Sequence, residues 1–298
     1  MTCRVCGTLD SSCRDAFHRK GIHTVHWECW SDCNLQCDFC YRSLRRPLDT
    51  SSALRLIDAI AHAGATRIIL AGGDPSLRSD LDQLCRHAVT QGLKCEIQTN
   101  AHKLTRALLE SLPLIDRVYL SLDGATSAAH DMFRAKRGNF AGVNRLLGIA
   151  ESGDLPVTVH SVASKRNWRE MPDVLEHIRK YSCVDTWSVL EFSAVGTGYL
   201  SRREHELAPA EWQEVSIRLH AAISDRPRLA LLGVHDKRAL YAMVSADGYA
   251  YRAAESASSQ VADHGRIGSI IDTHLQEIAD AWRIDSARHQ QRYAHEAN

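Results

Sequence analysis

Three cysteines stand close together in the stretch SDCNLQCDFCYRS, residues 31–43. Cys33, Cys37 and Cys40 follow the spacing C-x3-C-x2-C. A structural zinc ion usually takes four protein ligands, most often from two pairs with short spacers. Three thiolates instead suit a cubane iron–sulfur cluster, in which the fourth iron keeps an open coordination position. The stretch therefore favours an open, catalytic cluster site over a closed structural one.

Other thiols in the chain leave alternatives open. A zinc site in the same stretch could be completed by His26 or Cys29. Cys3 and Cys6 are spaced as a ligand pair, and together with Cys13 they could hold a second cluster or a zinc ion. Inert buried thiols are expected at the remaining positions, Cys85, Cys95 and Cys183.

The composition indicates a protein without a strong overall electrostatic field. Acidic and basic side chains number 36 each. This balance gives no general attraction to nucleic acids or anionic membranes, so we expect neither as a partner. No segment has the apolar length of a membrane span, and the N-terminus lacks the order of a signal peptide. We therefore expect a cytoplasmic protein whose ten cysteines are not a disulfide framework.

Apolar, β-branched runs alternate with amphipathic helical patterns from about residue 22 onward. Six strand-then-helix units predict an α/β protein with an open, parallel (β/α)6 partial TIM barrel, whose catalytic groups gather at the carboxyl ends of the strands. The predicted strands are 23–29, 66–73, 94–100, 117–124, 155–164 and 185–196. The predicted helices are 50–64, 78–92, 104–112, 140–153, 169–181 and 209–224.

Three motifs follow three of these strands. The first is CNLQCDFC, residues 33–40, the second is GGDP, residues 72–75, and the third is SLDGATSAAHDMFR, residues 121–134. In these motifs and their order, residues 22–200 resemble the radical S-adenosylmethionine (SAM) superfamily. Phe39 matches the aromatic residue that commonly precedes the last cysteine, whereas Asp74 stands where the family usually has glutamate.

The resemblance implies a site for one [4Fe-4S] cluster and SAM. The three cysteines would bind three irons, and the methionyl amino and carboxylate groups of SAM would chelate the fourth. The glycine-rich turn would offer backbone groups to the amino end of SAM. A hydroxyl and a guanidinium group would meet its carboxylate, and backbone after the sixth strand would meet the adenine. The implied residues are Cys33, Cys37 and Cys40 with Phe39, then Gly72, Gly73 and Asp74, then Ser121 and Arg134, and finally Val195 and Gly196.

The same resemblance implies an enzyme that cleaves SAM reductively to a 5′-deoxyadenosyl radical, which takes hydrogen from a substrate. A flavodoxin or ferredoxin would supply the electron. The first expectation is a small, sugar- or nucleoside-like biosynthetic substrate, because no cysteine follows Cys183 to bind auxiliary clusters like those of peptide maturases. Modification of a ribosomally made peptide, such as epimerisation, is the alternative. An iron–sulfur or zinc protein that senses SAM is the non-enzymatic alternative.

The predicted organisation has three parts: a cysteine-containing leader (1–21), a core (22–225) and a C-terminal extension (226–298). A hairpin pattern at 243–254 and an amphipathic pattern at 270–283 make the extension faintly similar to a SPASM extension without cysteines. We expect this extension to form a short cap, or lid, over the barrel. Candidate substrate contacts near strand ends are Glu28, Tyr41, Asp123 and Glu191.

Overall fold

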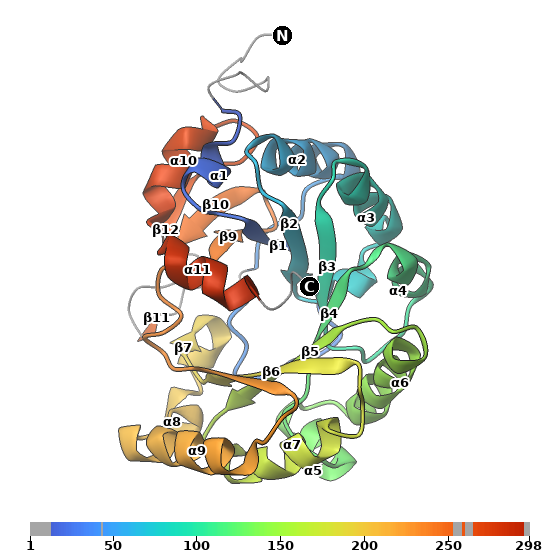
Figure 1. The fold of residues 1–298 in the computed structure, drawn as a ribbon, viewed down its shortest axis with the longest axis vertical. Coiled ribbons are helices and arrows are strands. Elements are labelled where there is room, and N and C mark those ends of the chain that lie inside the picture. The colour runs from blue at the N-terminus through green and yellow to red at the C-terminus, as the bar shows by residue number, and fades with distance from the viewer. Residues whose placement is uncertain (1–12, 43, 253–257, 260–264, 295–298) are drawn as a thin grey trace.

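A parallel sheet with helices on its outer face forms the centre of the molecule (Figure 1). The computed structural model describes residues 13–42, 44–252, 258–259 and 265–294. Six strands lie side by side in chain order, and each neighbouring pair is parallel, which confirms the predicted α/β partial barrel. They are β1 (Thr24–Trp30), β2 (Arg67–Gly72), β3 (Lys94–Thr99), β4 (Arg117–Ser121), β5 (Val157–Ala163) and β6 (Val184–Glu191).

Helices follow the strands close to the predicted positions because their capping residues are local in sequence. Asp49 accepts a hydrogen bond from the Ser52 N–H at the start of the first long helix, and Thr105 caps another. The predicted helices are α2 (Thr50–His62), α3 (Leu81–Thr90), α4 (Arg106–Ser111), α6 (Asn139–Ser152), α7 (Met171–Ile178) and α9 (Pro209–Ala222). The prediction omitted α1 (Ala16–Arg19), α5 (Ser127–Phe133), α8 (Arg202–His205) and α11 (Ser286–Tyr293).

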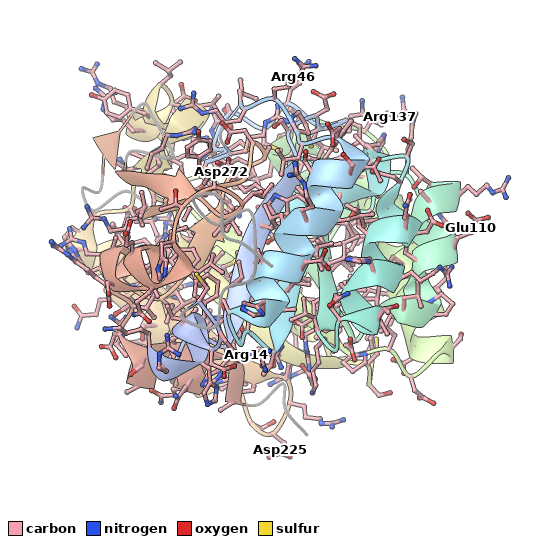
Figure 2. All side chains as sticks on the ribbon, turned by 90° about the horizontal axis from the view of Figure 1, so that it is seen from above. Arg14, Arg46, Glu110, Arg137, Asp225 and Asp272 are labelled. Atoms are coloured by element: carbon pink, nitrogen blue, oxygen red, sulfur yellow. The ribbon has the colours of Figure 1, made fainter. Side chains whose placement is uncertain are left out.

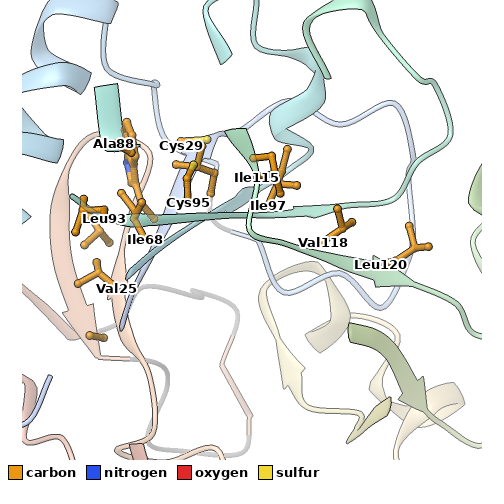
Figure 3. Packing of buried hydrophobic residues seen from close by; sticks show 14 of the residues in the cluster. Val25, Cys29, Ile68, Ala88, Leu93, Cys95, Ile97, Ile115, Val118 and Leu120 are labelled. Carbon is orange, nitrogen blue, oxygen red and sulfur yellow. The ribbon is translucent and has the colours of Figure 1, made fainter. Parts of the chain in front are cut away.

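Side chains on successive strand positions point alternately to the helices and to the barrel interior. The outward set forms one apolar layer with the helices, which includes Cys95 (Figure 3). Cys85 and Cys95 are buried, as expected, whereas Cys183 is only partly buried. The inward set includes several polar side chains: Arg67 forms an ion pair with Glu96 at 2.9 Å, and the Tyr119 hydroxyl donates to the same carboxylate at 2.8 Å. A polar interior leaves room for a polar site at one end of the barrel.

The segment after residue 226 extends the sheet at both edges, which differs from the short cap that we predicted. β8 (Arg228–Leu232) pairs with β6, and β9 (Ala242–Val244) pairs with β1, both in parallel. The predicted hairpin is present, since β10 (Tyr249–Arg252) is antiparallel to β9. The remaining strands are β12 (Gly265–Ser269), which pairs with β10, and the short pair of β7 (Ala194–Val195) and β11 (Ser258–Ser259).

The helix α11 (Ser286–Tyr293) lies across the opening of the barrel (Figure 1). The Nε2 atom of His289 accepts from the backbone N–H of Thr24, the first residue of β1, at 3.2 Å. Arg292 donates to the Ser188 hydroxyl at 3.2 Å, and the Tyr293 hydroxyl is hydrogen-bonded to the ring of His26. These contacts close the amino-terminal end of the barrel and leave the carboxyl end for ligands.

The start of the described chain packs on the C-terminal segment within the main core. Cys13 and Phe17 are buried, and the Phe17 ring packs on Trp282 of α10 (Leu275–Trp282), with ring centroids 5.1 Å apart. Cys3 and Cys6 lie outside the described residues. The predicted boundaries of the three parts stay predictions. Among the helices of the described residues, none combines the length and the hydropathy that a membrane span requires.

Candidate active site

A cavity of about 610 Å³ opens where the parallel strands end. The loop after β1 contributes all three motif cysteines to its wall, and the ends of β2, β3 and β4 contribute further residues. The structure thereby brings together predicted residues that are far apart in sequence. Those that line the cavity are Cys33, Cys37, Phe39, Cys40, Gly72, Gly73, Ser121 and Arg134, whereas Asp74, Val195 and Gly196 do not line it.

The cysteine thiols are partly or largely shielded from solvent. The backbone N–H of Leu35 donates to Cys33 Sγ at 3.4 Å, and Cys37 Sγ lies 3.6 Å from the carbonyl oxygen of Arg134. Burial raises the pKa of Cys37 to about 12, and it also raises the pKa values of Cys33 and Cys40. Thiols with raised pKa values stay protonated without metal, so binding of iron would release protons.

The buried side chain of Phe39 anchors the cysteine loop by packing on other aromatic residues. Its ring packs on Phe133 with centroids 4.4 Å apart, and the guanidinium carbon of Arg134 lies 5.3 Å from the Phe39 ring centroid. Phe39 and Phe133 belong to a small apolar cluster with Phe192 and Ala194 that is distinct from the main core. This cluster ties the loop after β1 to α5 and to the end of β6.

The two glycines of the GGDP turn allow close packing of the cysteine loop. A Cβ atom on Gly72, whose φ is 124°, would lie 2.2 Å from the Trp30 carbonyl oxygen. A Cβ atom on Gly73 would lie 2.2 Å from the Asp32 carbonyl oxygen. The Gly73 N–H donates to the Trp30 carbonyl at 2.6 Å. Glycine is therefore required here for contact between two protein segments, in addition to any contact with a ligand.

The Asp74 carboxylate forms hydrogen bonds with other groups of the protein. Its fully buried carboxylate accepts from the backbone N–H groups of Ser76, at 2.9 Å, and Asn100, at 3.0 Å, and from the Thr99 hydroxyl at 2.9 Å. Burial raises its pKa, while these hydrogen bonds favour the ionised form. The Asp74 N–H donates to the Asp32 carbonyl at 2.9 Å. Asp74 thus joins the ends of β2 and β3 to the cysteine loop.

Ser121, the last residue of β4, and Arg134, at the end of α5, both line the cavity. The Nε atom of Arg134 donates to the buried Asp123 carboxylate at 2.5 Å. Asp123 also accepts from the Val162 N–H at 2.7 Å, so it holds Arg134 in place and does not line the cavity. The bond to Asp123 engages only the Nε atom of Arg134. It fixes the orientation of the guanidinium group without using the two terminal nitrogens.

The residues after β6 pack on the cysteine loop. The Thr197 hydroxyl donates to the Cys40 carbonyl at 2.7 Å, and the Gly198 N–H donates to the same oxygen at 3.1 Å. Thr197 and Leu200 line the cavity, whereas Val195 and Gly196, predicted to meet the adenine, lie just outside its lining. The predicted contact of Val195 and Gly196 with the adenine stays a prediction.

Of the candidate substrate contacts, Tyr41 alone lines the cavity. The residue is 44% exposed, yet its hydroxyl is buried near Glu28 and hydrogen-bonded to Gln98, and burial raises its pKa. Glu191 accepts from the Val234 N–H at 2.8 Å, so it holds a turn after β8.

Gln98, Asn100 and His160 are among the polar residues of the cavity that the sequence alone did not single out. Asn100 donates from Nδ2 to Cys33 Sγ at 3.4 Å and to the Asn34 side chain at 2.9 Å. His160 lies on β5, with its ring centroid 5.2 Å from that of Tyr119, and burial lowers its pKa to about 3. For Gln98 and Asn100, the position at the carboxyl end of β3 was the available signal, whereas His160 lies in the middle of β5.

The residues present fit an iron–sulfur cluster. Three thiols from one loop reach the same cavity, two N–H groups already point at one of the sulfurs, and a buried guanidinium group lies nearby. Hydrogen bonds to sulfur and nearby positive charge are the features that proteins use to hold and tune such clusters. In the described part of the chain, no three His, Cys, Asp or Glu side chains are close enough together to hold a single metal ion.

Residues 27–178, about half of the chain, match the family model of the Radical SAM superfamily. The chain belongs to this superfamily. The match confirms the predicted family, with a [4Fe-4S] cluster and SAM as its cofactors. The role of each cavity residue toward these cofactors stays a prediction.

Curated and solved relatives of this radical SAM chain differ in what they act on. An AdoMet-dependent heme synthase of Methanosarcina barkeri is 29% identical over 64% of this chain and 56% of its own length. A PqqA peptide cyclase of Rhodopseudomonas palustris is 32% identical over 48% of this chain and 40% of its own. The chain thus spans about half the length of these relatives. Streptococcus suis SuiB, solved with its precursor peptide SuiA, shares the fold, with a TM-score of 0.68, 17% identity, and 91% and 66% coverage.

Proposed function

We propose that the chain is a radical SAM enzyme that removes a hydrogen atom from a small biosynthetic molecule. The observation that supports this most directly is the single cavity shared by the three cysteines, the glycine turn, Ser121 and Arg134. The cluster and SAM, when bound, supply a 5′-deoxyadenosyl radical. An electron carrier, for example a flavodoxin or ferredoxin, and a cytoplasmic location belong to the same proposal.

The chain's own residues would bind the cluster and SAM, orient them and shield the site from water. Cys33, Cys37 and Cys40 would hold the cluster, and Arg134, oriented by Asp123, would bind the SAM carboxylate together with Ser121. The Phe39 cluster and the segment after β6 cover the loop and limit access of water. Polar Gln98 and His160 and apolar Val162 and Leu190 line the same cavity and would contact the substrate.

A ribosomally made peptide is the second candidate substrate. PqqA peptide cyclases are among the similar curated proteins, and SuiB was solved with a precursor peptide. The exposed side chains of Tyr41 and Leu200 at the cavity would suit an extended chain that enters from solvent.

Anaerobic reconstitution and a hydrogen-transfer assay test both proposals. We expect about four irons per chain, and formation of 5′-deoxyadenosine from SAM that stops when Cys33, Cys37 and Cys40 are replaced by alanine. Extracts of cells grown in deuterated medium would then be separated into small-molecule and peptide fractions. Deuterium in 5′-deoxyadenosine from the small-molecule fraction supports the first proposal, and deuterium from the peptide fraction alone supports the second. A reconstituted protein without a cluster would contradict both.

A further inference from the structure

Basic side chains gather beside the cysteine loop on the face that carries the cavity. Lys103 follows β3, Lys136 and Arg137 follow α5, and Arg145 lies on α6. Lys103, Arg137 and Arg145 are exposed. Within the part of the chain that the structure describes, none of these four cations forms a salt bridge. We refer to His102, Lys103, Lys136, Arg137 and Arg145 as the basic patch.

Close packing holds the segments of the basic patch together. A Cβ atom on Gly142 of α6 would lie 2.2 Å from the Ala101 carbonyl oxygen, so the helix touches the loop after β3. Asn139 donates from Nδ2 to the Asn100 carbonyl at 2.7 Å. Burial, and then the charges of Lys136 and Lys103, lower the pKa of His102, which agrees with their proximity.

Asp131, an acidic residue beside the basic patch, is hydrogen-bonded to the backbone. Asp131 accepts from the backbone N–H groups of Gly138, at 2.6 Å, and Phe140, at 2.8 Å. It therefore caps the start of α6. The chain as a whole has a formal net charge of zero, so any attraction for an acidic partner must come from a local group such as the basic patch.

Two hydrogen bonds connect the basic patch to a predicted cluster ligand. The backbone N–H of His102 donates to Asn100 Oδ1 at 2.8 Å, and Asn100 Nδ2 donates to Cys33 Sγ at 3.4 Å. Figure 2 shows Arg137 at the same end of the molecule as Arg46, which follows the cysteine loop, and opposite Arg14 and Asp225. The basic patch is thus close to the cluster site and faces solvent at the cavity end.

We propose that the basic patch is the docking surface for an acidic, one-electron carrier protein. This inference rests on the proposed function, since only a chain that holds a cluster requires such a donor. In the step concerned, the reduced carrier loses one electron and the cluster gains it. Opposite charges on the two proteins would raise the rate of encounter by a factor of roughly 10 to 10³ at low ionic strength.

Charge reversal with a matched control tests the proposal. The patch variant is Lys103→Glu with Arg137→Glu. The control variant is Lys94→Glu with Lys180→Glu, two exposed lysines, the first at the start of β3 and the second between α7 and β6, so the net charge changes equally. The measured quantity is the second-order rate constant for reduction of the reconstituted cluster by reduced flavodoxin. Photoreduced 5-deazariboflavin, a small neutral donor, serves as the reference, and binding of oxidised flavodoxin is measured separately.

We expect the patch variant to lose about tenfold or more in the flavodoxin rate constant and in flavodoxin affinity at low salt. The loss should disappear near 1 M salt, where the screening length is about 3 Å. The control variant and all rates with deazariboflavin should stay near those of the unchanged protein. If the patch variant assembles no cluster, Lys103→Gln with Arg137→Gln replaces it, with a smaller loss expected.

Three results would overturn the proposal. The first is equal flavodoxin rates in the patch variant and the unchanged protein, and the second is an equal loss in the patch and control variants. The third is an unchanged flavodoxin rate combined with weaker binding of a polyglutamate peptide, which would make the patch a peptide site. A chain that binds no cluster at all would instead contradict the proposed function, so the two failures are distinguishable.

Discussion

Arg134 has one partner implied by the family resemblance and another one in the structure. The family motif assigns it to the SAM carboxylate, and the structure gives it a second partner, since Asp123 is wholly buried and bonded to its Nε atom. A buried carboxylate left without its partner costs several kcal/mol. The side chain therefore contributes to the fold as well as to the cavity.

The Arg134→Ala variant is expected to weaken SAM binding and to lower the free energy of unfolding by about 3–5 kcal/mol. The loss of SAM affinity follows from removal of a charged hydrogen-bond donor, and the loss of stability follows from the unpaired Asp123 carboxylate. Calorimetric SAM titration and urea unfolding measure the two effects. Arg134→Lys, which keeps the charge, should retain more stability. Unchanged SAM affinity in the alanine variant would move the carboxylate contact to another residue.

Histidines with lowered pKa values form a second feature at this scale. His130 is fully buried: Nδ1 accepts from the Asp123 N–H at 3.1 Å, and Nε2 donates to the Asn139 side chain at 3.0 Å. Burial lowers the pKa of His130 to about 4. A proton on Nδ1 would abolish the bond from Asp123, so the folded state requires the neutral ring.

Stability should therefore fall as the solution is acidified. The unfolded chain takes up a proton on His130 near its ordinary pKa of 6.5, whereas the folded chain does so only near 4. The contribution is present in full above 6.5 and is lost as the pH falls from 6.5 through about 4, with a size on the order of 3 kcal/mol. Urea unfolding at several pH values measures the slope. An identical slope in His130→Gln would rule out this residue as a cause.

At the scale of elements, the GGDP turn and the cysteine loop act as one unit. Backbone hydrogen bonds from Gly73 and Asp74 reach Trp30 and Asp32, and the two glycines leave no room for a side chain. The position of the three thiols thus depends on a turn that follows the next strand along the chain.

The Gly73→Ala variant should displace the cysteine loop, because the new Cβ atom would lie 2.2 Å from the Asp32 carbonyl oxygen. We expect reduced iron content after reconstitution and lower stability by about 1–3 kcal/mol. Iron analysis and thermal unfolding measure the effect. Gly148→Ala in α6 is the control, since nothing lies within 4 Å of its Cβ position and alanine favours a helix. Equal iron content in both variants would show that the loop tolerates the change.

At the scale of the whole molecule, the C-terminal segment completes the barrel. Strands β8 and β9 continue the sheet at its two edges, and α11 closes the amino-terminal end over a polar interior. Removal of all residues from 226 onward should therefore unfold the protein. Such a truncation cannot test whether the C-terminal extension acts as a lid. A substitution within α11 is the more selective experiment.

The His289→Ala variant should destabilise the closed end of the barrel. It removes partners from the Thr24 N–H and from the Leu240 carbonyl oxygen, which lies 2.8 Å from Nδ1. Each buried backbone group left unpaired costs about 1–3 kcal/mol. Thermal unfolding of the full chain measures the loss, and Gln291→Ala, on the exposed side of α11, should change stability by less than about 0.5 kcal/mol. Equal stability of the two variants would mean that α11 contributes little.

The sequence alone determined the parallel barrel, the family and the cysteine motif, because hydrophobic alternation, capping residues and ligand spacing are local properties of the chain. Tertiary structure decided which side chains share the cavity. Asn100 and His160 belong to none of the three sequence motifs, and Asp74 and Asp123 have partners inside the protein. The tertiary structure also decided that the residues after 226 join both edges of the sheet. The periodicity of a segment does not show with which distant strand it pairs.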